Sequence, residues 1–139
     1  MTRKIRYSVA MSLDGFIATE DGGYDWIPMD EGVDFGAYLE KIDTLLMGRG
    51  TYETAVSTPE SRALLDSMTV YVVSTTVDAA AHEDVTVIGQ ADRADVVGEI
   101  ARLKAETGKD IWLFGGGVLF RALIDAGLVD RVEVAVVPV

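Results

Sequence analysis

The sequence predicts an α/β fold, a three-layer α/β/α sandwich around a mostly parallel central sheet. Short apolar runs that are typical of buried strands alternate with segments whose apolar residues recur at helical spacing. Glycines directly follow several of these runs, where a strand would turn into a helix. Repeated strand–helix–strand units favour a parallel sheet with helices on both faces.

The expected elements follow one another along the chain. Strands are predicted at residues 4–12, 44–47, 69–75, 85–88, 111–114 and 131–137. Helices are predicted around residues 51–57, 60–67 and 92–107, and from the glycines at 115–117 through Ala126. A further helical face is expected from Val33, Phe35, Tyr38, Leu39 and Ile42. Gly108 and Gly127 are placed as C-terminal helix caps, the second with an apolar contact from Leu128.

Length and composition exclude several classes of protein. The 139 residues fit a single domain, residues 1–139, which we expect to be either whole or short of its C-terminal strands. The net charge of −11, from 23 acidic and 12 basic residues, argues against nucleic-acid binding, which needs a basic face. No apolar run reaches the ~18 residues of a membrane span or forms a signal peptide, so we expect a cytoplasmic protein. With no cysteine and one histidine, neither a disulfide nor a metal site is expected.

The segment Gly48-Arg49-Gly50-Thr51 is the first candidate site, because it follows a predicted strand and opens a helix. Glycines let a ligand approach the backbone, and free N–H groups at a helix start favour an anion. Arg49 can add a bidentate grip on phosphate. The segment is therefore either a phosphate site or an ordinary turn with a solvated arginine.

A second candidate lies at Gly115-Gly116-Gly117, between the strand residue Phe114 and the helix residue Val118. A tight turn needs one glycine with positive φ, whereas three glycines favour a ligand lying against the backbone. The spacing is not the Gly-x-Gly-x-x-Gly pattern of the Rossmann fold.

Polar residues near other strand ends are weaker candidates. Ser74 and Thr75 end the 69–75 strand, where α/β proteins bind ligands, although a capping role fits them as well. The turn with Asp14 and the loop with Trp26 and Glu31 bring carboxylates near an aromatic ring, which suits either proton relay or plain solvation.

Four of these segments together resemble the dihydrofolate-reductase-like superfamily. They are SVAMSLDGFIA (8–18), LLMGRGTYE (45–53), VYVVSTT (70–76) and LFGGGVLFRALIDAGLVDRVEVAVVPV (113–139). They are most similar to the branch that contains the reductase domain of bacterial riboflavin biosynthesis. The resemblance implies an NADPH-dependent reductase that acts on a small heterocyclic or carbonyl/imine substrate and forms a homodimer.

The resemblance also implies roles for individual residues. Those expected to bind NADPH are Val9, Ala10, Ile17 and Phe114 near the nicotinamide, Gly48, Arg49, Gly50 and Thr51 at phosphates, Ser74 and Thr75 at the adenosine ribose or its 2′-phosphate, and Gly115, Gly116, Gly117, Val118 and Leu119 at the pyrophosphate. A cis peptide is expected between Gly115 and Gly116. Asp14 is the first choice for substrate contact or proton delivery, Glu31 is the second, and Trp26 is expected on the substrate side.

Alternative functions remain open from the sequence. Glu31, five residues after Trp26, matches by spacing the carboxylate of true dihydrofolate reductases, so a folate reductase is one alternative. A non-catalytic NADPH-binding module is another, and an oligomeric scaffold without ligand is a third. The scaffold explains the glycine clusters poorly, because glycine costs stability wherever it is not needed.

Overall fold

The computed structural model describes residues 3–15, 39–74, 85–89 and 95–137. Within these ranges six strands form one sheet in the order β4-β3-β2-β5-β1-β6. Each neighbouring pair is parallel, which confirms the predicted fold class. The strands are β1 (Ile5–Ser12), β2 (Ile42–Gly48), β3 (Thr69–Val73), β4 (Thr86–Ile88), β5 (Asp110–Gly115) and β6 (Arg131–Val137). The helices are α2 (Arg49–Val56), α3 (Pro59–Asp66), α4 (Val96–Ala105) and α5 (Gly117–Asp125).

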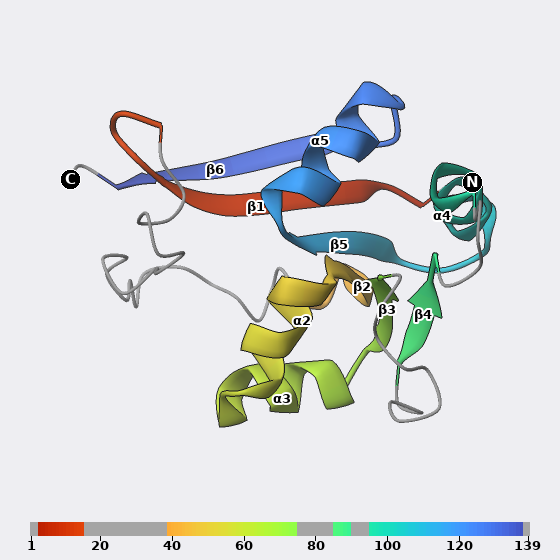
Figure 1. Cartoon of the computed structure of the whole chain (residues 1–139), viewed down its shortest axis with the longest axis horizontal. Coiled ribbons are helices and arrows are strands. Elements are labelled where there is room, and N and C mark those ends of the chain that lie inside the picture. The colour runs from red at the N-terminus through yellow and green to blue at the C-terminus, as the bar shows by residue number, and fades with distance from the viewer. Residues whose placement is uncertain (1–2, 16–38, 75–84, 90–94, 138–139) are drawn as a thin grey trace.

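The helices cover both faces of the sheet and enclose two cores. Successive side chains of a strand point to opposite faces, and β5 shows this alternation clearly. Ile111 and Leu113 pack in one core with α4 and α5, whereas Trp112 packs in the other with α2 and α3. Figure 1 shows α5 on the opposite side of the sheet from α2 and α3. The three-layer arrangement therefore follows from two apolar faces on each central strand.

The predicted helical face that ends at Ile42 was wrong at that residue. Ile42 begins β2 rather than extending a helical face, and the Val33, Phe35 and Tyr38 of that face lie outside the described residues. The helix predicted for 92–107 is confirmed over the shorter range Val96–Ala105, with Asp95 as its N-cap accepting a 2.8 Å hydrogen bond from the Gly98 N–H.

Gly108 is not a helix cap. Helix α4 ends at Ala105 and is followed by Glu106 in an extended conformation. A Cβ at Gly108 would lie 3.0 Å from Arg3 Nε and 3.1 Å from Asp43 Oδ2. The glycine therefore leaves room for two side chains that are distant in sequence. The Gly127 cap is confirmed, since its φ is +72° and Leu128 packs against the core.

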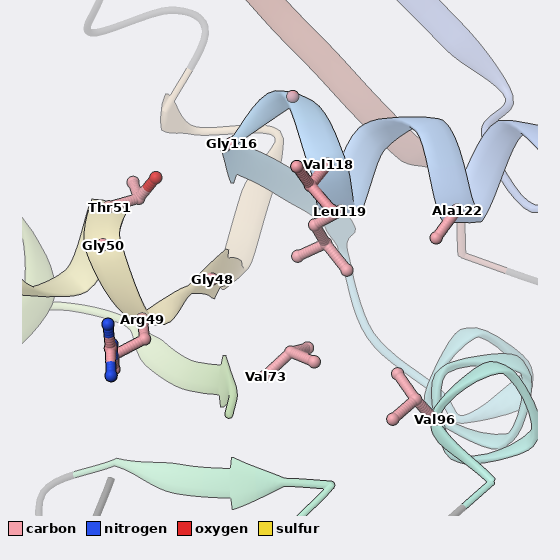
Figure 2. Close-up of a pocket in the computed structure, with 11 residues that line it drawn as sticks. Gly48, Arg49, Gly50, Thr51, Val73, Val96, Gly116, Val118, Leu119 and Ala122 are labelled. Carbon is pink, nitrogen blue, oxygen red and sulfur yellow. The ribbon is translucent and has the colours of Figure 1, made fainter. Parts of the chain in front are cut away.

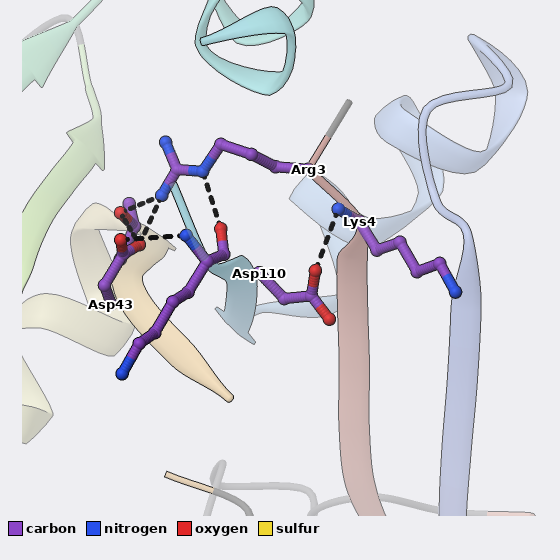
Figure 3. Close-up of polar contacts among 6 residues, drawn as sticks. Arg3, Lys4, Asp43 and Asp110 are labelled. Atoms are coloured by element: carbon purple, nitrogen blue, oxygen red, sulfur yellow. Dashed lines mark hydrogen bonds and ion pairs between the residues drawn. The ribbon is translucent and has the colours of Figure 1, made fainter. Parts of the chain in front are cut away.

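The amino ends of three strands are joined by a polar cluster around Arg3 (Figure 3). Arg3 is 5% exposed, donates from Nε to the Lys109 carbonyl at 2.7 Å, and pairs with Asp43 at 2.5 Å and with the Thr44 hydroxyl. Burial by itself raises the pKa of the Asp43 carboxyl. Hydrogen bonds from the Lys109 N–H and the Thr44 hydroxyl, with the adjacent guanidinium, outweigh burial and hold that pKa below its usual value.

Helix length also bears on membrane insertion. No helix in the described ranges has both the length and the apolar character needed to span a membrane.

Candidate functional site

A cleft of about 450 Å³ opens at the carboxyl edge of the sheet, where β2, β3 and β5 end. Figure 2 shows the cleft between the first turn of α2 and the first turns of α5. The α2 side supplies Gly48, Arg49, Gly50 and Thr51. The other walls are formed by Val73, Val96, Gly116, Gly117, Val118, Leu119 and Ala122. The carboxyl edge of a parallel sheet is where α/β proteins commonly bind their ligands.

Two helix N-termini meet in this cleft. Gly48 is the N-cap of α2 and Gly116 is the N-cap of α5, and neither helix has a side-chain cap or an acidic residue in its first turn. A Cβ on Gly48 would lie 3.9 Å from the Gly116 nitrogen, so the two helix starts are adjacent. The first N–H groups of a helix lack intrahelical partners and carry the positive end of its dipole. The arrangement therefore suits an anion that faces both helices.

Three glycines at the cleft are not required by the fold itself. Gly48 and Gly116 have negative φ values of −80° and −104°, which other residues adopt readily. A Cβ at Gly116 would come no closer than 3.5 Å to the nearest atom beyond its chain neighbours, and at Gly50 it would meet nothing within 4 Å. Because glycine weakens a helix or strand, its presence here fits a group outside the fold that approaches the backbone.

Gly115 differs from these glycines. Its φ is +152°, and a Cβ would lie 3.0 Å from the Thr51 hydroxyl oxygen. The group that occupies the space beside Gly115 is thus the Thr51 side chain, which packs α2 against the end of β5. The peptide between Gly115 and Gly116 is cis, which confirms that expectation.

Among the described residues that line the cleft, Arg49 is the one with a charged side chain. It is the first residue of α2, and its Nε lies 3.6 Å from Glu53 Oε1 one turn later. A cation at a helix N-terminus is disfavoured by the helix dipole, so an anion bound nearby would relieve an unfavourable charge.

The rest of the cleft is apolar. Val73 ends β3, Val96 begins α4, and Leu119 and Ala122 lie on consecutive turns of α5. Val73, Val96 and Ala122 are lining residues that the sequence pattern did not predict. An apolar residue that lines a cleft follows the same periodicity as one in the core, and the position of Val73 just before Ser74 was the available signal.

The comparisons with known proteins agree with this architecture. A family model described as the RibD C-terminal domain matches residues 3–139. The chain belongs to the RibD C-terminal domain family. It is 37% identical to the uncharacterized protein YwjB of Bacillus subtilis (strain 168), over 100% of this chain and 79% of YwjB. It is 33% identical to the uncharacterized protein YyaP of the same strain, over 99% of this chain and 76% of YyaP.

Two solved structures extend the comparison for this RibD C-terminal domain. A putative riboflavin biosynthesis protein from Shewanella sp. PV-4 is 26% identical, with a TM-score of 0.70 over 100% of this chain and 78% of that protein. Dihydrofolate reductase from Enterococcus faecalis, complexed with NADP(H) and RAB-propyl, shares the fold with 23% identity and a TM-score of 0.68, over 100% and 74% of the two chains. The predicted superfamily and branch are confirmed, and the fold is of the reductase type.

Several residues expected at the RibD-type site lie outside the cleft lining. Ser74 is buried directly after β3, and its N–H donates to the Ile88 carbonyl at 2.9 Å. Phe114 packs in the α2/α3 core, 4.9 Å from the Trp112 ring. Val9 and Ala10 are half-buried in β1, the strand next to β5.

The substrate-side residues are less completely described. Asp14 is exposed in the turn after β1, where its carboxylate accepts the Ser12 hydroxyl at 2.5 Å. The other expected residues, Ile17, Trp26, Glu31 and Thr75, lie outside the described part of the chain. Across the described ranges no group of three or more His, Cys, Asp or Glu side chains could hold a metal ion.

Proposed function

We propose that this chain is an NADPH-dependent reductase that acts on a small heterocyclic or carbonyl/imine substrate, as a riboflavin-pathway pyrimidine reductase does. The observation that carries the proposal is the pair of uncapped helix N-termini that share one cleft, lined by glycines that the fold does not require. When bound, the cofactor would supply the hydride. The chain would bind the cofactor and orient it against the substrate.

The charge of the molecule makes a local phosphate site necessary. With a net charge of −11, the overall field repels a polyanionic dinucleotide. The backbone N–H groups at the starts of α2 and α5 would bind the pyrophosphate, and Arg49 would bind the 2′-phosphate through its guanidinium. Glycine at positions 50 and 116 would let the phosphate oxygens approach the backbone.

The adenosine and nicotinamide ends of the dinucleotide would bind at different parts of the carboxyl edge of the sheet. The apolar walls at Val73, Val96 and Leu119 would take the adenosine ring. Strand β1 lies beside β5 in parallel register, with Tyr7 opposite Leu113. Val9 and Ala10 follow Tyr7 on β1 toward the same carboxyl edge of the sheet, and the nicotinamide would lie near them.

The substrate side rests on Asp14, with Trp26 and Glu31 as further candidates. An exposed carboxylate at the end of β1 is accessible for substrate contact or proton delivery. The similarity to a putative riboflavin biosynthesis protein favours a ribosylated pyrimidine over a folate. A folate reductase is the alternative, for which Glu31 would be the decisive carboxylate.

A non-catalytic NADPH-binding module is a second candidate. It is favoured by the position of Asp14, which lies outside the cleft lining. The two candidates differ in turnover. The module would bind NADPH without oxidising it in the presence of any pterin, pyrimidine or simple carbonyl compound.

The test is the substitution Arg49→Ala, with affinities for NADPH and NADH measured by calorimetry. Loss of a hydrogen-bonded charge costs about 1.5–3 kcal/mol, so NADPH should bind roughly 10- to 100-fold more weakly while NADH changes little. Arg49→Lys should recover part of the NADPH affinity, because it restores the charge without the bidentate geometry. An equal loss for both nucleotides would rule out the 2′-phosphate role and leave a pyrophosphate role for Arg49.

A further inference from the structure

Glu53 is the acidic side chain that faces Arg49 along α2. The two residues are four apart, and the Arg49 Nε lies 3.6 Å from the Glu53 Oε1. Both side chains are half exposed or more, at 52% and 66%. The pair thus lies at the rim of the cleft, where a bound anion and solvent can both reach it.

The geometry of the contact lets one guanidinium serve two partners. Glu53 approaches the Nε edge, and a guanidinium can hold a phosphate bidentately through its two Nη atoms. A carboxylate at the Nε edge therefore orients the planar group without using the fork that recognises phosphate. This contact restricts the rotamers that the long Arg49 side chain samples.

We propose that Glu53 is a positioning residue for Arg49, and that it raises the selectivity of the cleft for nucleotides with a ribose 2′-phosphate. The proposal rests on the proposed function, because it assumes that Arg49 contacts this phosphate. Glu53 acts through Arg49 and does not touch the nucleotide itself.

Two opposing effects decide whether Glu53 raises or lowers the affinity for NADPH. The carboxylate repels the phosphate across the guanidinium, which at about 8 Å in water costs roughly twofold in affinity. Immobilising an arginine side chain on binding costs up to roughly thirtyfold, and pre-orientation by Glu53 removes part of that cost. An exposed ion pair is worth up to roughly fivefold in an equilibrium constant, which sets the ceiling for the net gain in NADPH affinity.

The test is Glu53→Gln, which keeps the shape of the side chain and removes its charge. We expect the variant to bind NADPH roughly two- to fivefold more weakly in calorimetry, with NADH affinity unchanged and the unfolding temperature lowered by no more than a few degrees. A general structural role would lower the affinity for both nucleotides together. In an Arg49→Ala background the substitution should have no effect, since the residue being positioned is gone.

The chain offers a matched control on α5. Arg121 and Asp125 form another exposed pair four residues apart, with Nε 2.9 Å from Oδ2, and neither lines the cleft. Asp125→Asn should therefore leave the NADPH-to-NADH ratio unchanged.

The outcomes separate this proposal from the proposed function. If the native chain prefers NADPH and Glu53→Gln keeps or raises that preference, the positioning role is wrong while the reductase proposal stands. If the folded native chain binds neither nucleotide, the proposed function fails and the role of Glu53 fails with it.

Discussion

Gly50 is the second residue of α2, and alanine at such a position would favour the helix. A Cβ there would meet no atom within 4 Å, so the fold has room for a methyl group. A Cβ at Gly116 would lie 3.5 Å from the Thr51 hydroxyl oxygen, an ordinary van der Waals distance, and the backbone angles there suit any residue. The fold therefore does not require glycine at positions 50 and 116, whereas a ligand that approaches the backbone would require it.

We expect Gly50→Ala to raise the free energy of unfolding by about 0.5–1 kcal/mol, because it removes backbone freedom from the unfolded chain. The added methyl would occupy the space of the phosphate, and NADPH should bind roughly tenfold or more weakly. Thermal unfolding and calorimetry on the same sample measure both effects.

Gly127 is the matched control for this substitution. A Cβ there also meets nothing within 4 Å, but its φ of +72° is strained for alanine. Gly127→Ala should lower stability and leave NADPH binding intact. A Gly50→Ala protein that is more stable and binds NADPH as tightly as the native chain would mean that Gly50 does not face the ligand.

Among the elements, β1, β2 and β5 are tied together at their amino ends by Arg3 and Asp43. The folded pKa of Asp43 lies below its usual value near 3.8. The pair therefore contributes stability that is fully present above the unfolded pKa and is lost as pH falls through the folded pKa. The Asp130 carboxyl behaves in the same direction, because hydrogen bonds from Lys104 and the Ile5 N–H outweigh the opposing effect of burial on its pKa.

We expect Asp43→Asn to lower the free energy of unfolding by roughly 1–3 kcal/mol at pH 7, since buried Arg3 loses its charged partner. Urea unfolding between about pH 3 and 7 tests this. The difference between native and variant should shrink as the pH falls below about 4, where the unfolded chain takes up protons at Asp43 while the native chain still holds this carboxyl ionised. A difference that stays constant down to pH 3 would show that the ionised carboxylate is not the stabilising group.

An element could be predicted from the sequence when the residues that determine it are neighbours in the chain. The strand–glycine–helix segments at Gly48 and Gly115 were predicted because the apolar run, the glycines and the helix start are consecutive. The position of Ile42 was missed because one apolar residue fits a helical and a strand period equally, and its pairing with Asp110 decides the outcome. Gly108 was misassigned for a similar reason, since the Arg3 side chain that needs the space lies more than a hundred residues away.

The candidate site was predicted in part for the same physical reason. Its polar half, from Gly48 to Thr51 together with Gly116 and Gly117, carries a local glycine signal. Its apolar half comes from β3, α4 and α5, and residues such as Val96 follow the same pattern as core residues. These three elements meet at one cleft because of the order of the strands in the sheet. That order cannot be predicted from any one segment of the sequence.

At the scale of the whole molecule, charge and topology act in opposite directions on a nucleotide. The net charge of −11 produces an overall field that repels a polyanion. The parallel sheet brings the ends of β2 and β5 together and thereby concentrates two helix dipoles and Arg49 at one point. The homodimer that the family resemblance implies stays a prediction, as does the identity of the substrate.

The most direct test of this account is a calorimetric titration of the purified native chain with NADPH, with NADH as the control. The account predicts a single site that binds NADPH roughly tenfold or more tightly than NADH, because the 2′-phosphate adds a charge-assisted contact with Arg49. A chain that is folded by circular dichroism and binds neither nucleotide would contradict it.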